Sequence, residues 1–214
     1  MNMAAFASGS ADKTVPGHYA PSQTALLLLD FHSMFVKKAG GASASAASTV
    51  ASGMRTWAKS VGITVIHCLI DTSATPFSTC KDLERFASIV AAMKSSGGDA
   101  EPAELTSGGG DITFTRRPGH ASAFKSPGLE DFLKQREVKS LILTGLSTSG
   151  CVMRTAITAC DEEYVVSVIS DGCADPAEGV HDLMIGKILN NRGYVFTAAE
   201  FQEGYQGVAR SLDD

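Results

Sequence analysis

The sequence predicts an α/β fold with three layers, in which a mostly parallel, six-stranded sheet lies between helices. Two observations lead to this prediction. Short apolar runs, typical of strands buried on both faces, alternate with segments of helical character along the chain. Such alternation favours parallel strands joined by right-handed crossovers, with helices on both faces of the sheet. In addition, the 214 residues are 44% hydrophobic and 19% charged, which is enough to bury the core of one such domain.

Six segments share the short, apolar character of a strand. In chain order they are Ala25–Asp30, Ile63–Ile70, Ile112–Thr115, Ser140–Thr144, Tyr164–Ile169 and Tyr194–Thr197. The first two read ALLLLD and ITVIHCLI, with no regular polar alternation, so both faces of these strands are expected to be covered.

Five segments between the strands carry helical signals. They are Ser43–Val61, Asp82–Ser95, Gly128–Arg136, Cys151–Glu163 and Gly179–Asn191. Met54, Trp57 and Val61 recur at helical spacing in the first, and Asp82 is expected to cap the second. The segment Ser96–Gly110 has five glycines and almost no apolar content, so we expect a weakly ordered hinge there.

Composition limits the classes of protein to consider. Residues 1–22 lack periodicity and are expected to form a flexible N-terminal arm, which leaves residues 23–214 as a single domain. The net charge of −5, without long basic runs, argues against nucleic acid as a partner. Ala25–Leu29 is too short an apolar stretch to cross a membrane, and no signal peptide is evident. Five cysteines without a pairing pattern suit a reduced, cytoplasmic protein.

The expected sheet also indicates where to look for a site. In parallel α/β sheets, ligands bind beyond the carboxyl ends of the strands, near the point where the strand order reverses. The side chains that follow the predicted strands are Asp30, Asp71, Arg116, Arg117, those of the turn at 145–151, and Asp171.

Cys151 is the strongest candidate among them, because it follows a strand and a turn of small residues and is expected to begin a helix. The positive end of a helix dipole lowers the pKa of a thiol, and the free N–H groups of the first turn can hold an oxyanion. On its own, however, Cys151 also fits a structural cysteine. Asp30 is either a base for the thiol or an ordinary residue of a strand-end turn.

Together these residues resemble the isochorismatase-like cysteine hydrolases. The resemblance rests on Asp30 after the leucine run, a strand that ends in a basic residue, the triplet Ser122–Phe124, and the pattern TG-x-x-T-x-x-C-V-x-x-T-A around Cys151. It covers about residues 24–198. That superfamily includes nicotinamidases, N-carbamoylsarcosine amidases and maleamate-type amidases, so the resemblance implies a Rossmann-like hydrolase fold and a homo-oligomer.

The resemblance further implies a catalytic triad. Asp30 would accept the thiol proton, Cys151 would attack the carbonyl carbon, and a lysine would stabilise charge. It also implies a cis peptide bond between Leu146 and Ser147, so that the N–H groups of Ser147 and Cys151 form an oxyanion hole.

The chain departs from the family pattern at the lysine, where Arg116 and Arg117 stand instead. The preferred register aligns Arg117 with the lysine, although the two arginines also fit a solvated surface pair. An arginine keeps the positive charge but does not release a proton at working pH, so it would act as an electrostatic partner. If it lines an open pocket, its removal should slow acylation with little effect on stability.

Four further side chains are expected to line the substrate pocket: His32, Phe35, His120 and Phe124. Each of them is also common in protein cores. The metal site of nicotinamidases uses an aspartate and two histidines, whereas this chain offers Asp71 followed by Ser73. We therefore expect no metal and no cofactor.

These observations favour a cysteine hydrolase that cleaves the C–N bond of a small-molecule amide or ureide through a thioester. Two alternatives remain open. The missing lysine is compatible with a catalytically silent protein used for binding or assembly. A vinyl-ether (isochorismate) hydrolase shares the fold, but such members lack the cysteine nucleophile.

Overall fold

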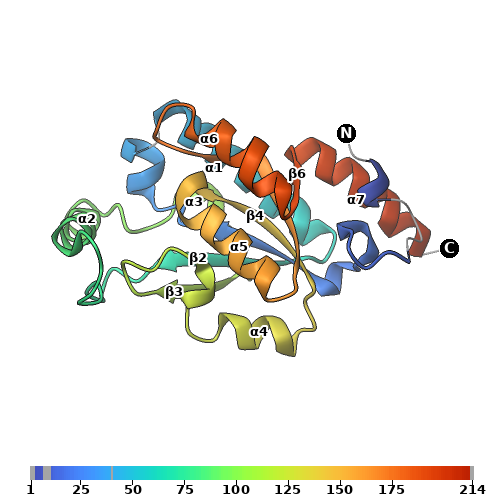
Figure 1. Ribbon diagram of the computed structural model, residues 1–214, viewed down its shortest axis with the longest axis horizontal. Helices are drawn as coiled ribbons and strands as arrows, with labels where there is room; N and C mark the ends of the chain where they lie inside the picture. Colours follow the sequence, from blue (N-terminus) through green and yellow to red (C-terminus); the bar gives the residue numbers. More distant parts are fainter. Residues whose placement is uncertain (1–2, 7–10, 40, 213–214) are drawn as a thin grey trace.

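The computed structural model describes residues 3–6, 11–39 and 41–212. Its centre is a six-stranded sheet in the order β3-β2-β1-β4-β5-β6, in which every neighbouring pair is parallel (Figure 1). The strands are β1 (Thr24–Leu29), β2 (Thr64–Ile70), β3 (Ile112–Arg116), β4 (Ser140–Leu146), β5 (Val165–Ala174) and β6 (Tyr194–Phe196). The predicted α/β fold class is confirmed.

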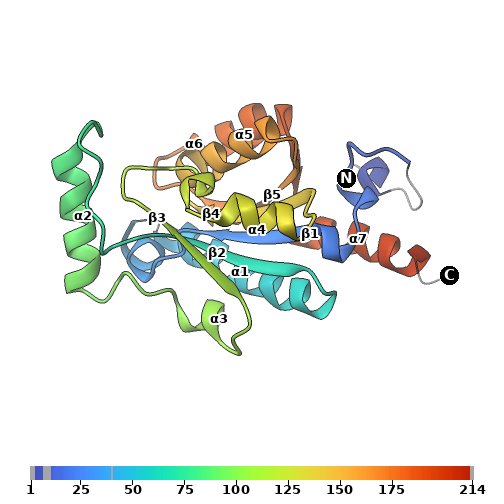
Figure 2. The ribbon, with the colours of Figure 1, turned by 90° about the horizontal axis from the view of Figure 1, so that it is seen from below.

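Helices cover both faces of the sheet (Figure 2). The helices are α1 (Gly41–Ser60), α2 (Leu83–Ser95), α3 (Ala103–Thr106), α4 (Leu129–Gln135), α5 (Met153–Asp161), α6 (Val180–Leu183) and α7 (Ala198–Leu212), of which α2 stands apart from the sheet. One hydrophobic cluster lies under α1 and α7, and a second lies under α4 and α5. Within the described ranges, no helix is long and apolar enough to cross a membrane.

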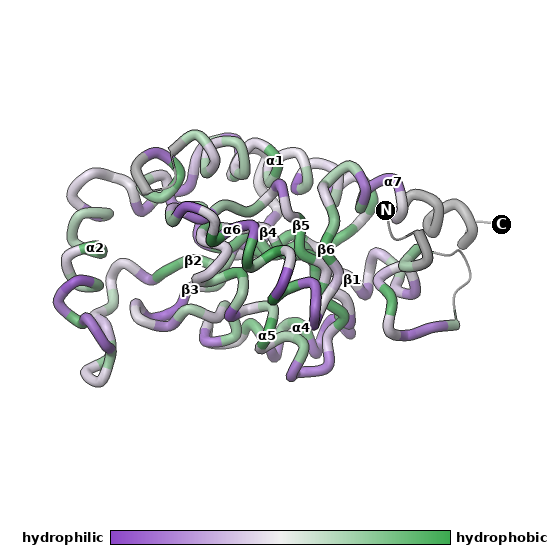
Figure 3. The backbone as a smooth tube through the Cα atoms, turned by 45° about the horizontal axis from the view of Figure 1, so that its top comes forward, coloured by the Kyte–Doolittle hydropathy of each residue, from purple (hydrophilic) through white to green (hydrophobic). Residues whose placement is uncertain are grey.

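The leucine run of β1 explains how a single strand serves both clusters. Successive side chains of a strand point to opposite faces. Leu26 and Leu28 therefore belong to the cluster under α1, and Leu27 and Leu29 to the cluster on the other face. All four are fully buried, and the central strands stand out as the most hydrophobic part of the chain in Figure 3.

Two helical regions differ from the expectation, whereas the helix expected from Cys151 begins as predicted. Cys151 directly follows the non-helical residue Gly150, in the turn Thr148–Val152 that leads into α5. The helix expected over Gly179–Asn191 is divided into α6 and two short irregular turns. Helix α7 was not predicted, because two glycines interrupt its pattern; the burial of Phe201 and Tyr205 against the core stabilises it instead.

The described part of the N-terminal arm packs against this last helix. The ring of Phe6 lies 5.1 Å from the ring of Phe196 and 5.3 Å from that of Phe201, measured between centroids. A Cβ atom at Gly204 would lie 2.3 Å from the Phe6 ring, so only glycine allows this contact. The arm thus closes one end of the hydrophobic cluster under α1 and α7.

The glycine-rich segment after α2 is anchored, contrary to the expected hinge. The backbone N–H groups of Ser33 and Met34 donate to the carbonyl oxygens of Ala100 and Gly98, at 2.8 and 3.0 Å. Leu105, in the middle of the segment, is fully buried. The sequence pattern missed this because backbone hydrogen bonds, which any residue can make, supply much of the attachment.

A buried ion cluster anchors the same segment to β2 and α1. The His67 ring contacts Glu101 through Nδ1 at 2.8 Å and Asp111 through Nε2 at 3.1 Å. Arg55 Nε donates to the same Asp111 at 2.5 Å, and Lys59 Nζ at 2.7 Å. Burial alone lowers the pKa of His67, but the hydrogen bonds and charges of Glu101 and Asp111 outweigh it, so the pKa is raised.

We expect this cluster to make the stability of the protein pH-dependent. Because the folded-state pKa of His67 is raised, its contribution is fully present below the unfolded value of about 6.5 and is lost as the pH rises through the folded value. His67→Gln should lower the free energy of unfolding by about 1–3 kcal/mol at pH 6, and by less at pH 9, in urea titrations. Equal losses at the two pH values would contradict a charged His67.

Candidate active site

The order of the strands reverses between β1 and β4, and the candidate site lies at this point. Asp30 directly follows β1, and β4 leads into the turn that carries Cys151. The two strands are unusually close here: a Cβ atom at Gly145 would lie 2.6 Å from the Cβ of Leu29 and 2.7 Å from its carbonyl oxygen. Glycine therefore allows the ends of both strands to meet at one place, where parallel α/β sheets bind their ligands.

Arg116 forms a buried, two-point ion pair with Asp30. Its NH1 and NH2 groups donate to the two carboxylate oxygens at 2.9 and 2.5 Å, and its Nε donates to the carbonyl oxygen of His120 at 2.9 Å. Arg116 is 2% exposed and Asp30 is 4% exposed. Since β2 separates β3 from β1, the side chains of Arg116 and Asp30 together bridge two strand spacings of about 4.8 Å each. Asp30 itself has a positive φ of 55°, which is uncommon for a residue with a side chain and is often associated with functional sites.

The preferred alignment of Arg117 with the family lysine is wrong, because Arg116 and not Arg117 contacts Asp30. Strand β3 continues to Arg116, and successive side chains of a strand alternate in direction. The guanidinium of Arg117 is consequently directed away from Asp30. Its Nε donates to the carbonyl oxygen of Thr75 at 2.6 Å and its NH2 to that of Pro76 at 3.1 Å.

The thiol of Cys151 is buried next to this ion pair. Its Sγ donates to the carbonyl oxygen of Leu146 at 3.1 Å, and the peptide bond between Leu146 and Ser147 is cis. Burial, together with the neighbouring carboxylate of Asp30, raises the pKa of Cys151 well above its usual value, although the charge of Arg116 acts in the opposite direction. The pKa is therefore raised and not lowered as expected, because desolvation and the charge of Asp30 outweigh the charge of Arg116, which favours the thiol over the thiolate in the free protein.

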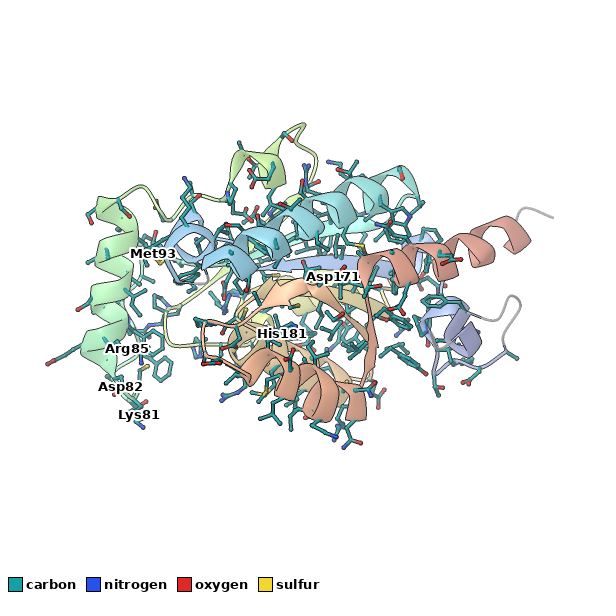
Figure 4. All side chains as sticks on the ribbon, turned by 90° about the horizontal axis from the view of Figure 1, so that it is seen from above. Lys81, Asp82, Arg85, Met93, Asp171 and His181 are labelled. Atoms are coloured by element: carbon teal, nitrogen blue, oxygen red, sulfur yellow. The ribbon has the colours of Figure 1, made fainter. Side chains whose placement is uncertain are left out.

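Two side chains from the following elements hold the turn that carries this thiol. Asp175, directly after β5, accepts a hydrogen bond from the backbone N–H of Ser149 at 2.8 Å. The hydroxyl of Thr148 lies 2.9 Å from Nδ1 of His181, which is on α6 (Figure 4). The position of Cys151 thus depends on contacts from β5 and α6 as well as on its own strand.

A cavity of about 360 Å³ opens over these groups, within the range of roughly 300–1,000 Å³ that is typical of small-molecule sites. Its lining includes Asp30, Arg116 and Cys151, together with Ser147 of the turn. Apolar side chains make up much of the remaining wall. They are Phe35, Ala44, Ile70, Phe86, Ile89, Ala121, Leu146, Ala174 and Pro176.

Of the four side chains expected in the pocket, Phe35 and His120 line it. His120 stacks on the ring of Phe77, and burial, with smaller effects of nearby positive charges, lowers its pKa. The other two lie elsewhere. They are His32 and Phe124, which contact the backbone and the core.

His32 is held by backbone groups at both ring nitrogens. Its Nδ1 lies 2.7 Å from the carbonyl oxygen of Asp99, and its Nε2 accepts from the N–H of Ile70 at 3.1 Å. Phe124 packs against the ring of Tyr164 with 5.7 Å between centroids. Both therefore have a structural role in this fold, and their expected contact with substrate is corrected.

Sequence analysis missed the contribution of α2 to the pocket. Arg85, Phe86 and Ile89 of this helix line the cavity, whereas Val90 and Met93 are its buried residues (Figure 4). The helical spacing of these apolar side chains was visible in the sequence. It did not indicate which part of the molecule the helix would face, because α2 stands apart from the sheet (Figure 1).

The other acidic candidates, Asp71 and Asp171, lie outside the lining of this cavity. Asp71 accepts from the N–H and the hydroxyl of Ser73, at 2.8 and 2.5 Å, and Asp171 accepts from the N–H of Ala198 at the start of α7. Among the described residues, no group of three or more His, Cys, Asp or Glu side chains is arranged to hold a metal ion. The residues present thus do not fit the metal site of an aspartate and two histidines.

Comparisons with known proteins identify the family and the fold. Residues 24–200 match the family described as the Isochorismatase domain. A nicotinamidase of Escherichia coli (strain K12) is 33% identical over 79 residues, which cover 35% of this chain and 36% of that protein. The chain therefore aligns with only about a third of the length of this curated relative.

Solved structures share the fold over most of the chain. A cysteine hydrolase from Pseudomonas syringae pv. phaseolicola has a TM-score of 0.73 at 18% identity, covering 88% of this chain and 94% of that one. The N-carbamoylsarcosine amidase from Thermoplasma acidophilum has a TM-score of 0.63 at 17% identity, covering 82% and 96%. An isochorismatase family protein from Burkholderia thailandensis has a TM-score of 0.71 at 20% identity, covering 90% and 97%.

Because Arg116 is buried, we expect its removal to lower the stability of the protein, whereas an arginine in an open pocket would have had little effect on it. Arg116→Met should destabilise the protein by about 3–5 kcal/mol, because it leaves the carboxylate of Asp30 buried without its partner. Arg117→Met is the matched control, and we expect it to cost only about 0.5–1.5 kcal/mol, since this exposed side chain loses hydrogen bonds to two carbonyl oxygens but leaves no buried charge unpaired. Chemical denaturation of both variants measures the difference; similar values would argue against the ion pair.

The raised pKa of Cys151 predicts slow alkylation of the resting protein. At pH 7 the iodoacetamide reaction of this thiol should be slower than that of a free thiol, and it should accelerate as the pH rises above 9, because only the thiolate reacts. Mass spectrometry of the peptide that contains Cys151 measures the rate without interference from Cys80 and Cys160. Fast modification at neutral pH would show that the thiolate already exists in the free protein.

Proposed function

Since the chain belongs to the isochorismatase family of hydrolases, we propose that it is a cysteine hydrolase that cleaves the C–N bond of a small amide or ureide. One observation carries this proposal. Cys151, Asp30 and Arg116 come from three different strand ends and converge on one cavity at the reversal of the strand order. A nucleophile beside a carboxylate, with a fixed positive charge behind it, suits acyl transfer.

In the first step Asp30 acts as the base. The resting thiol is protonated, so attack requires that its proton move to a carboxylate oxygen of Asp30 as the S–C bond forms. Arg116 occupies one direction of approach to each carboxylate oxygen, and each oxygen retains a further lone pair for the proton. The backbone N–H groups of Ser147 and Cys151 would stabilise the oxyanion that develops on the substrate.

The remaining steps return the site to its starting state. Asp30 gives the proton to the leaving nitrogen as the C–N bond breaks, which releases ammonia or an amine and leaves a thioester on Cys151. Water then attacks the thioester and transfers a proton to Asp30. The acid product departs, and Cys151 regains its proton from Asp30.

Arg116 serves as a positioning and electrostatic residue in this scheme. Its guanidinium stays protonated at working pH, so it does not transfer protons. It holds both oxygens of Asp30 in place and offsets the negative charge that builds up between the carboxylate and the thiolate. This role requires the positive charge and the reach across β2, both of which an arginine supplies.

Two of the similar proteins are amidases by name, which supports the chemistry proposed for this chain. The cysteine also argues against a vinyl-ether hydrolase, since such members of the family lack it. A catalytically silent binding protein remains the alternative that the high thiol pKa and the replacement of lysine favour.

Release of ammonia from a panel of small amides and ureides tests the proposal. We expect the wild-type protein to hydrolyse at least one of them and Cys151→Ala to lose activity at least about 10³-fold, while its circular dichroism spectrum stays unchanged. Cys160→Ala is the matched control, because Cys160 lies outside the pocket lining. Ammonia release by Cys151→Ala at the wild-type rate would exclude the thiol as the nucleophile, and no release from any substrate would favour the silent alternative.

A further inference from the structure

His120 brings an imidazole without bonding partners to the active-site cavity. It follows the end of β3 in the chain and lines the same cavity as Asp30 and Cys151. Among the residues that the structure describes, neither of its ring nitrogens makes a hydrogen bond or an ion pair. The rings of His32 and His67, by contrast, are bonded at both nitrogens.

From this arrangement we infer that His120 orients the water molecule that hydrolyses the thioester on Cys151. The inference rests on the function proposed above and adds a catalytic residue to its second half. One O–H group of the water donates to a ring nitrogen of His120, and the other gives its proton to Asp30. The water oxygen bonds to the acyl carbon and the S–C bond breaks, so that the acid is released and Cys151 regains the proton from Asp30.

Backbone and stacking contacts hold His120 in place. Its carbonyl oxygen accepts from Nε of Arg116 at 2.9 Å, and its N–H donates to the carbonyl oxygen of Arg117 at 3.2 Å. Its ring stacks on the ring of Phe77, with 4.8 Å between centroids and 28° between the planes. None of these contacts uses a ring nitrogen, so the imidazole is positioned and still has its full capacity for hydrogen bonds.

The guanidinium of Arg116 connects this histidine with the proposed base. The same planar group binds both carboxylate oxygens of Asp30, at 2.9 and 2.5 Å, and the carbonyl oxygen of His120. Because a guanidinium is rigid, it fixes the carboxylate and the backbone of His120 relative to each other. A water molecule held by both side chains is therefore oriented for attack, which is an effective way to accelerate a reaction.

One acceptor suits both halves of the reaction. The leaving nitrogen and the attacking water occupy the same position in turn, because the sulfur, the oxyanion and the acyl chain take the other three positions around the carbon. Both the amide nitrogen and the water are donors, and a neutral imidazole nitrogen accepts from either. The guanidinium groups in the lining, those of Arg85 and Arg116, are donors only and do not serve this purpose.

The charges around His120 favour the neutral form that accepts. Burial lowers its pKa, and positive charges lower it further; these are the charges of Lys125, Arg117 and Arg116. Arg85 of α2 adds a positive charge to the lining, while the negative charge of Asp30 is paired with Arg116. The imidazole therefore accepts at neutral pH and loses this ability as the pH falls through a value below the usual pKa of about 6.5.

A thioester formed without amide cleavage tests this role directly. p-Nitrophenyl acetate transfers its acetyl group to a nucleophilic thiol. After the excess reagent is removed, mass spectrometry of the peptide that contains Cys151 measures how fast the acetyl group is hydrolysed. His120→Phe keeps an aromatic ring against Phe77 but has no acceptor nitrogen, so we expect hydrolysis about tenfold slower than in the wild-type protein.

His18→Phe is the matched control. His18 also contacts an aromatic ring, that of Tyr19 at 4.9 Å between centroids, but it lies outside the pocket lining. We expect this variant to hydrolyse the acetyl group at the wild-type rate.

Two conservative variants give a readout that a merely structural role would not change. His120→Asn places an amide oxygen near the position of Nδ1 and His120→Gln near that of Nε2, and we expect one of them to retain part of the wild-type rate. Hydrolysis by the wild-type protein should slow as the pH falls through the lowered pKa of His120. This decrease should be absent from the variant that retains activity, because an amide oxygen does not take up a proton in this range.

The outcomes separate this inference from the proposed function. Equal rates of acetyl hydrolysis in the wild-type protein and His120→Phe would overturn the inference, and so would an equal loss in His18→Phe. Hydrolysis that depends on His120, in a protein that releases no ammonia from any amide, would retain the water site and reject the amide substrate. If p-nitrophenyl acetate does not acetylate Cys151 in the wild-type protein, both proposals are overturned.

Discussion

The buried ion pair between Arg116 and Asp30 is the interaction on which the site depends. It connects the end of the edge strand β3 with the end of the central strand β1, across the whole width of β2. Two charges with almost no access to water are stable together because each satisfies the other, and neither is stable alone. The pair therefore holds the base of the proposed reaction in place and also determines the electrostatic environment of Cys151.

The environment that protects this ion pair keeps the thiol protonated. A thiolate at rest would place a second negative charge next to Asp30 in a buried region. The single positive charge of Arg116 does not compensate for two negative charges and for the loss of water around the sulfur. Nucleophilicity must then arise during the reaction, as the proton moves over a short path to Asp30. Such a site would be protected from adventitious oxidation and alkylation, which require the thiolate.

The sequence was sufficient for the features that depend on local pattern. The unbroken leucines of β1 predicted a strand buried on both faces, and the spacing around Cys151 predicted a turn between a strand and a helix. The sequence was insufficient where the direction or the burial of a side chain depends on strand register or on packing between distant segments. Arg116 and Arg117 are identical neighbours in the sequence, so the sequence alone does not show which of them faces Asp30. That depends on where β3 ends, because side chains alternate in direction along a strand. The sign of the pKa shift of Cys151 likewise depends on burial, which no short motif contains.

The placement of α2 has a consequence for how such enzymes diversify. The groups proposed for bond cleavage are on strand ends inside the core, where a substitution disturbs the whole sheet. Arg85, Phe86 and Ile89 are on a peripheral helix of which only Val90 and Met93 are buried, so their replacement leaves the sheet intact. Selection can therefore change the preferred molecule through the segment between β2 and β3 while the reaction stays the same. This separation makes α2 the natural region in which to engineer new selectivity.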